Sequence, residues 1–169
     1  MDSCLLVDTA MPSVFVHGHT YQGHPAGCAA ALEVQRIIQE QNLLENVQAM
    51  GVLLSTRLRE RLLGHANIGD IRGRGLFWGI EFVADKNKMK PFPAEDHVAM
   101  ALAQRGVAEA YGINVYPGAG SEDGIRGDHI IVSPAFNVRP EEIEWIVDTV
   151  GRLVDDFFAA RNGAGRDSS

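Results

Sequence analysis

Two stretches in the second half of the chain place apolar and polar residues with the period of a helix. The longer one begins at Pro140, carries acidic residues in its first turn, and keeps one apolar face as far as Phe158. The shorter one covers residues 94–105 and stops at Gly106. The sequence therefore predicts two helices here, followed by a flexible tail over residues 161–169.

Two further helices are predicted in the first half of the chain. The first covers residues 25–41, because a proline stands where a first helical residue needs no N–H, and small apolar residues follow it. The second follows Asn42 and Glu45, which have the spacing of a capping box. Its apolar stripe runs through residues 47–62, and Gly64 is expected to end it.

β-Branched and aromatic residues gather in three short runs, over residues 76–83, 113–116 and 129–133. The first run is largely apolar on both of its faces, so we expect a buried strand. Residues 69–75 are rich in glycine, and we interpret them as the approach to that strand. A long glycine-rich loop over residues 117–128 separates the other two runs.

The order of these elements favours an α/β fold in which helices pack on a small sheet. A soluble chain of 169 residues can bury roughly 70% of the surface that it exposes when unfolded. The length is therefore sufficient for one folded domain with a core of its own.

Composition and charge argue against several classes of protein. The chain has 22 acidic and 15 basic residues, with a net charge of −7, and its basic residues form no stripe that would favour nucleic acid. Cys4 and Cys28 are too few for a disulfide framework. No stretch has the apolar length or the flanks of a membrane span or a signal peptide. We therefore expect a cytoplasmic protein that binds neither nucleic acid nor a membrane.

Three of the six histidines lie in one short stretch, HGHTYQGHP, at residues 17–25. A zinc site of His17, His19 and His24 is one interpretation, but their spacing matches no helical pair and no cysteine joins them. A plain surface turn is a second. In a third, glycines let backbone N–H groups approach a phosphate, Thr20 adds a hydroxyl donor, and the positive end of the next helix lies nearby. The residues by themselves leave these alternatives open.

Five segments occur in a fixed order over about residues 14–158. They are FVHGHTYQGHPAGCAAALEV, ENVQAMGVLLSTRLRERL, IGDIRGRGLFWGIEFV, YPGAG followed by GIRGDHIIVSPAF, and EEIEWIVDTVGRLVDDF. Together they resemble the class III pyridoxal-phosphate aminotransferases, which include the omega-aminotransferases and the acetylornithine and ornithine aminotransferases. The resemblance implies fold type I. It also implies that His19 and Thr20 bind the phosphate of pyridoxal 5'-phosphate across the interface of a homodimer.

The resemblance further implies how the chain is divided. Residues 1–24 would be a remnant of a large domain with the phosphate-binding turn, and residues 25–63 an interdomain helix and the helix after it. Residues 64–160 would be the C-terminal small α/β domain, with the tail over residues 161–169 behind it. Members of the family are much longer than this chain, so we expect it to be a C-terminal portion.

Lysine is scarce in this sequence. A pyridoxal-phosphate enzyme holds its cofactor through a Schiff-base lysine in a desolvated pocket. The only lysines are Lys86, Lys88 and Lys90, which share a charged loop that ends in prolines. In the family that the chain resembles, the Schiff-base lysine precedes the histidine-rich stretch. We therefore expect no catalytic residue in this chain and no activity of the isolated chain.

Arg126 is the candidate for substrate binding. An arginine in this loop binds a substrate carboxylate in several omega-aminotransferases that the segment resembles, and the alternative is a solvated loop arginine. Ornithine-type relatives carry an arginine where this chain has Ile131 and two prolines at Pro134-Ala135, so ornithine-type specificity is not expected. Arg72 and Arg74 are expected to donate to backbone carbonyls at the strand entrance.

The prediction is thus the C-terminal part of an enzyme that transfers an amino group from an amine or amino acid to a 2-oxo acid, with no metal. The alternative is a non-catalytic fragment, or an interaction subunit that complements a separately encoded large domain. In either case the apolar residues 29–34 and part of residues 77–82 should remain uncovered.

Overall fold

The computed structural model of the chain describes residues 19–164, and side chains as far as residue 161. The described residues form two compact units, one that ends at Ile37 and one that begins at Ile38. Within residues 19–164 no helix is long and apolar enough to cross a membrane.

The first unit contains a turn over residues 20–23 and most of helix α1 (Pro25–Glu40). The helix begins at Pro25 as predicted, because a proline at the first helical position gives up no hydrogen bond. No residue of α1 is buried, and Leu32 and Val34 are among its exposed apolar side chains. The expected exposure of residues 29–34 is confirmed.

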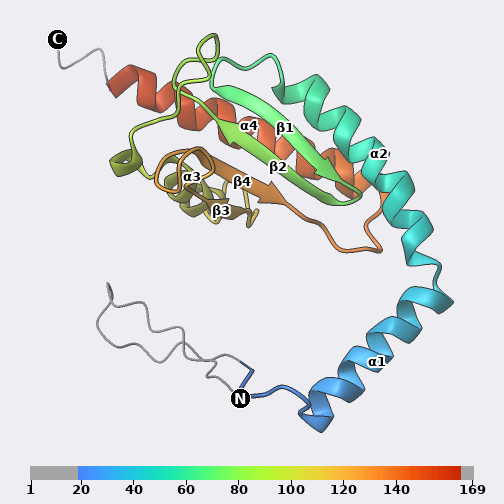
Figure 1. The fold of residues 1–169 in the computed structure, drawn as a ribbon. Helices are drawn as coiled ribbons and strands as arrows, with labels where there is room; N and C mark the ends of the chain where they lie inside the picture. The colour runs from blue at the N-terminus through green and yellow to red at the C-terminus, as the bar shows by residue number, and fades with distance from the viewer. Residues whose placement is uncertain (1–18, 165–169) are drawn as a thin grey trace. The chain divides into compact units, whose positions relative to one another are not determined.

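The second unit packs helices on a four-stranded antiparallel sheet, so the predicted α/β fold is confirmed (Figure 1). The sheet has the order β1-β2-β4-β3. Its strands are β1 (Ile68–Arg74), β2 (Phe77–Phe82), β3 (Tyr116–Gly118) and β4 (Asp128–Val132). The helices are α2 (Leu43–Leu62), a short 3-10 helix η1 (Ala94–Asp96), α3 (Val98–Gly106) and α4 (Pro140–Ala164). α2 packs against α4, which runs behind the sheet in Figure 1.

The core lies between one face of this sheet and the helices. Alternate residues of β2 and β4 are buried, as the two-residue period of a strand requires. The apolar stripes predicted for α2 and α4 supply the other side of the core. The buried members of those stripes are Leu54, Leu58, Leu62, Ile143, Val147, Val150, Leu153, Val154 and Phe158.

The ends of α2 differ from the prediction. Asn42 has a left-handed backbone conformation, with φ 52°. Its side chain makes no capping hydrogen bond, so the predicted capping box is wrong. Asn tolerates this conformation better than most residues do. At the other end the helix stops at Leu62, and the Lys86 amine donates to the carbonyl oxygens of Leu63 and His65. A distant lysine therefore takes the place of the glycine cap.

The glycine-rich residues before β2 form a strand that the sequence did not reveal. β1 pairs with β2 from Ile68 opposite Phe82 to Arg74 opposite Phe77. Gly73 lies so close to its partner strand that a Cβ would be 2.2 Å from the carbonyl oxygen of Phe77. Glycine weakens the local preference for a strand, but here it permits the close approach.

Three other boundaries are shifted. The helix predicted over residues 94–105 is broken at His97, which is left-handed, so η1 and α3 are separate. β3 begins at Tyr116, where the predicted strand ended. α4 continues to Ala164, beyond the predicted start of the tail, and the Arg161 guanidinium donates to Asp96 at 2.5 Å.

Candidate functional site

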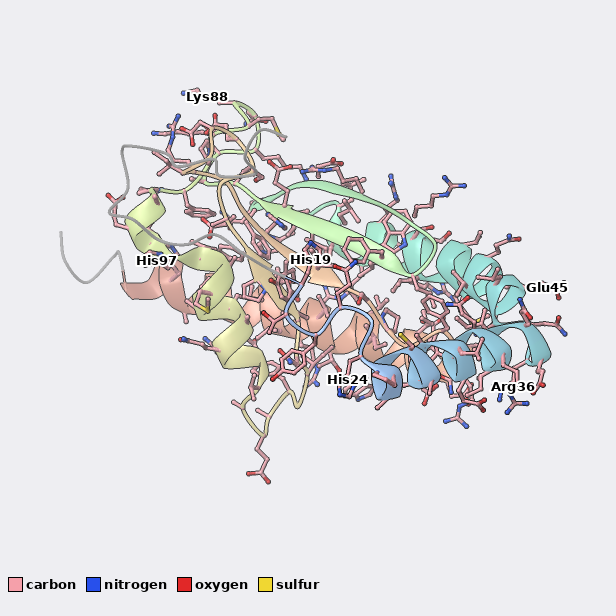
Figure 2. The ribbon with its side chains drawn as sticks, turned by 60° about the horizontal axis from the view of Figure 1, so that its bottom comes forward. His19, His24, Arg36, Glu45, Lys88 and His97 are labelled. Atoms are coloured by element: carbon pink, nitrogen blue, oxygen red, sulfur yellow. The ribbon has the colours of Figure 1, made fainter. Side chains whose placement is uncertain are left out.

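Residues 19–24 of the histidine-rich stretch form a tight turn just before α1. Gln22 N–H donates to the His19 carbonyl at 2.9 Å, and His24 N–H donates to the Tyr21 carbonyl at 3.1 Å. His19 and Gly23 both have positive φ angles, of 67° and 77°. Figure 2 shows His19 on the segment that leads to the helix and His24 at the start of the helix. The turn is therefore defined by its own backbone.

The turn leaves several hydrogen-bond donors without an acceptor among the described residues. Thr20 is exposed, and among the described residues its N–H and that of Tyr21 have no acceptor. Both N–H groups and the Thr20 hydroxyl are thus available beside the amino-terminal end of α1, where the helix dipole favours negative charge. His19 and Thr20, the two predicted phosphate residues, are adjacent in this turn, and a phosphate matches this donor set.

The metal interpretation of the same stretch gains nothing from the structure. His17 lies outside the described residues, and the rings of His24 and Tyr21 face each other edge-on, with centroids 6.3 Å apart. Within the part of the chain that the structure describes, no three groups of metal-ligand type come together.

Arg126, the predicted substrate residue, belongs to a compact loop of the second unit. The side-chain Nε of Arg126 donates to Asp123 Oδ2 at 2.8 Å, and the backbone N–H of Arg126 donates to Asp123 Oδ1 at 2.7 Å. Glu122 lies 3.5 Å from the guanidinium. The Arg126 carbonyl accepts from Glu122 N–H, which closes the loop. The guanidinium is half exposed and already has a carboxylate partner.

The carboxylate of Asp123 is strongly stabilised in its charged form. The hydrogen bond from the backbone N–H of Arg126 lowers the pKa of Asp123 most, and the bond from the Arg126 side chain comes next. Together they bring this pKa to about 2. The same pairing raises the pKa of Arg126 above its usual value. A substrate carboxylate would therefore have to compete with Asp123 for this guanidinium.

Arg72 does not have the role expected from the sequence. Its guanidinium pairs with the carboxylates of Asp70 and Glu81 on the face of the sheet away from the core, and not with backbone carbonyls. Arg59 of α2 instead makes a bond of the kind that was expected of Arg72, donating to the Ile71 carbonyl at 2.8 Å. No local sequence pattern indicates this exchange, because Arg59 lies a whole loop away from the strand.

Asp128 is a residue whose role sequence reasoning missed. Its side chain is buried, and Oδ1 accepts from the N–H of Ala99 at 2.9 Å. It therefore caps the first turn of α3 from the start of β4. The partners are 29 positions apart, so no local pattern could reveal the cap.

Comparison with known proteins places these features in a family. The sequence profile of "Aminotransferase class-III" matches residues 3–154. The chain belongs to this family. An aminotransferase of Gibberella zeae is 52% identical over 141 residues, which are 83% of this chain and 27% of that protein. An uncharacterized aminotransferase of Schizosaccharomyces pombe is 42% identical over 153 residues, which are 90% of this chain and 32% of that protein.

A solved structure supports the assignment at the level of the fold. The omega transaminase from Pseudomonas jessenii in complex with PMP superposes with a TM-score of 0.67 and 32% identity, over 84% of this chain and 29% of that one. The chain thus spans about a quarter to a third of the length of these class III relatives.

The family uses pyridoxal 5'-phosphate, so the lysines of this chain are relevant. The Lys86 amine is engaged with the carbonyls of Leu63 and His65. Lys88, labelled on an outer loop in Figure 2, has a side chain that is 79% exposed, and Lys90 is exposed as well. The turn thus offers hydrogen-bond donors of the kind that a phosphate accepts, whereas the described lysines are exposed or already engaged.

Proposed function

We propose that this chain supplies the C-terminal part of a pyridoxal-phosphate-dependent class III aminotransferase. The complete enzyme would move an amino group from an amine or amino acid to a 2-oxo acid, and would act as a homodimer. When bound, the cofactor supplies the electron sink that lets the amino group leave one carbon and join another. Thr20 and His19 would hold its phosphate.

The observation that carries this proposal is the phosphate-fitting turn in a chain that matches the family profile over residues 3–154. The turn offers backbone and hydroxyl donors next to a helix terminus, and the Thr20 side chain is exposed to receive a ligand. Charge-assisted hydrogen bonds of this kind are about twice as strong as neutral ones.

Arg126 would contribute to substrate specificity in the same enzyme. A guanidinium that can exchange Asp123 for a substrate carboxylate would accept amine substrates that carry a carboxylate as well as those that do not. Because Asp123 stays ionised down to about pH 2, this exchange would depend on the substrate and not on protonation of the loop.

The isolated chain would not catalyse the reaction. Its three lysines are either exposed or engaged at the end of α2, and a Schiff-base lysine needs a desolvated pocket. The activity would therefore depend on residues that this chain does not supply.

A chimera tests the proposal. In it, this chain replaces the region that it matches in the Gibberella zeae aminotransferase. Thr20→Ala in the chimera removes one charge-assisted hydrogen bond, which is worth roughly 1.5–3 kcal/mol. We expect the dissociation constant for pyridoxal phosphate, measured by fluorescence titration, to rise about ten- to a hundredfold.

The matched control is Thr56→Ala, the same change at an exposed threonine of α2 whose hydroxyl bonds to the Val52 carbonyl. It should leave cofactor affinity unchanged. Equal affinity of the Thr20→Ala chimera and its parent would contradict the phosphate assignment, and stoichiometric zinc lost on His17→Ala would replace it with a metal site.

A further inference from the structure

Two arginines of the second unit lie over the ring of one buried tyrosine. Tyr111, in the turn after α3, is 9% exposed. The centre of its ring is 6.0 Å from the guanidinium carbon of Arg105 in α3 and 5.8 Å from that of Arg152 in α4. A guanidinium over an aromatic ring is attracted by the quadrupole of the ring. Since α3 also packs against α4, two positive charges are held beside one ring.

Within the part of the chain that the structure describes, neither of these guanidinium groups has a carboxylate partner. Most arginines of the same unit do have one. Those with an ion pair are Arg57, Arg61, Arg72, Arg126, Arg139 and Arg161. The N–H groups of Arg105 and Arg152 are therefore available to a ligand.

The acidic residues of α4 beside Arg152 do not neutralise it. Asp148 and Asp156 each lie four positions from Arg152, which is the spacing of helical ion pairs, yet neither pairs with it. Asp156 accepts instead from the Tyr111 hydroxyl at 2.7 Å. Tyr111 thus engages a carboxylate through its hydroxyl and both guanidinium groups through its ring.

We propose that Arg105 and Arg152 bind a small anion that carries a phosphate group, beside Tyr111 between α3 and α4. A guanidinium recognises phosphate oxygens through paired N–H donors. Two guanidinium groups match the charge of nearly −2 that a phosphate monoester carries near neutral pH. This site uses no residue of the turn at Thr20, and the proposed transamination does not require it.

The surroundings of the pair favour a compact anion over an acidic protein or an anionic membrane. Glu109, Asp148 and Asp156 are exposed and lie close to the two arginines in the sequence. The whole chain has a net charge of −7. These negative charges repel an extended anionic surface, whereas one phosphate group can contact the two guanidinium groups alone.

Titration of the full chain with inorganic phosphate tests the site, with sodium chloride used to keep the ionic strength constant. The side-chain Nε–H signals of Arg105 and Arg152 in nitrogen–proton NMR spectra should shift along saturable curves that give one dissociation constant. Glycerol phosphate, a soluble monoester, should produce the same pattern. The Nε–H signal of Arg139, whose guanidinium is paired with Glu142, should not move.

Substitutions identify the groups that bind. Arg105→Gln and Arg152→Gln should each weaken phosphate binding roughly tenfold or more, measured on the signal of the remaining arginine. Lysine at either position keeps the charge but loses the paired donors, so it should cause a smaller loss. Arg139→Gln is the matched control, because it removes the same charge from an arginine that already has carboxylate partners, and it should leave the dissociation constant unchanged.

Shifts that do not saturate, or that chloride reproduces, would overturn the proposal, because they would report ionic strength alone. Retention of the chain on phosphatidic acid vesicles, with no response to glycerol phosphate, would also overturn it and indicate a membrane surface. The backbone N–H signal of Thr20 reports the proposed cofactor turn separately. Loss of phosphate binding at Thr20 in Thr20→Ala, with the two arginine curves unchanged, would show that the two sites are independent.

Discussion

At the scale of single residues, His65 connects the fold to pH. Its Nδ1 accepts the N–H of Asn67 at 3.0 Å, and its ring packs near Phe158 with centroids 5.5 Å apart. Burial lowers the pKa of His65, and the charges of Lys86 and Arg61 lower it further against the opposite effect of Asp155. The structure therefore favours the neutral ring.

The sign of the resulting pH dependence follows. The pKa of His65 in the folded protein is below its value of about 6.5 in the unfolded chain. The contribution of His65 to the free energy of unfolding is therefore fully present above about pH 6.5. It is lost as the pH falls toward the folded pKa, since the unfolded chain then binds more protons. We expect the urea midpoint of the second unit to fall less between about pH 7.5 and pH 5.5 in His65→Gln than in the parent. A glutamine can still accept from Asn67.

The control for this comparison is His24→Gln, which changes an exposed histidine of the first unit. It should reproduce the parent's loss of stability on acidification. An identical loss in His65→Gln and the parent would show that the His65 ring does not contribute to the pH dependence.

At the scale of elements, Gly51 decides how closely α2 can lie against the hairpin turn. Alanine would gain about 1 kcal/mol of helix propensity at this position. Its Cβ, however, would be 2.5 Å from the Gly75 carbonyl oxygen and 2.8 Å from the Gly75 Cα, and neither backbone atom can move independently. Gly51→Ala should therefore destabilise the second unit by roughly 1–3 kcal/mol, as overpacking does.

Urea unfolding followed by the fluorescence of Trp78 and Trp145 measures this effect. Gly79→Ala is the matched control in the same sheet, because its Cβ would meet only the Arg72 carbonyl at an ordinary distance of 3.6 Å. It should leave the unfolding free energy unchanged or slightly higher. A Gly51→Ala variant as stable as the parent would mean that the helix can move away from the turn at no cost.

The elements also show which parts of the fold the sequence could predict. The stripes of α2 and α4 were predictable because burial repeats at helical spacing, and those residues form the core. β1 was not, because glycine obscures its preference for a strand and pairing with β2 overrides that preference. The caps by Lys86 and Asp128 depend on contacts 21 to 29 positions away, which no local pattern encodes.

The same division holds for the candidate site. The turn at His19 and Thr20 could be anticipated because its glycines, its hydroxyl and the following proline are contiguous. The pairing of Arg126 with Asp123 could not be inferred from residue types, because it depends on how the loop folds back on itself. The position of the turn was therefore predictable, and the carboxylate partner of Arg126 was not.

At the scale of the whole molecule, the distribution of lysine amines determines what the chain can do with pyridoxal phosphate by itself. The Lys86 amine donates to two carbonyls at the end of α2, while the side chains of Lys88 and Lys90 are exposed. An exposed lysine amine is surrounded by water and lacks the desolvated pocket of a Schiff-base lysine, so its condensation with an aldehyde is weak and reversible.

We therefore expect the isolated chain to form no stoichiometric covalent adduct with pyridoxal phosphate. After borohydride reduction, peptide mapping should show slow partial labelling, greater at Lys88 and Lys90 than at Lys86, because only the Lys86 amine must leave two carbonyl partners to react. The chimera with the Gibberella zeae enzyme is the positive control, and its adduct should map to a lysine outside this chain. A single stoichiometric adduct at one of the three lysines, together with turnover of an amine and a 2-oxo acid, would show that the chain carries a complete catalytic site. Slow partial labelling with no stoichiometric site would instead agree with a chain that contributes phosphate donors and leaves the Schiff base to other residues.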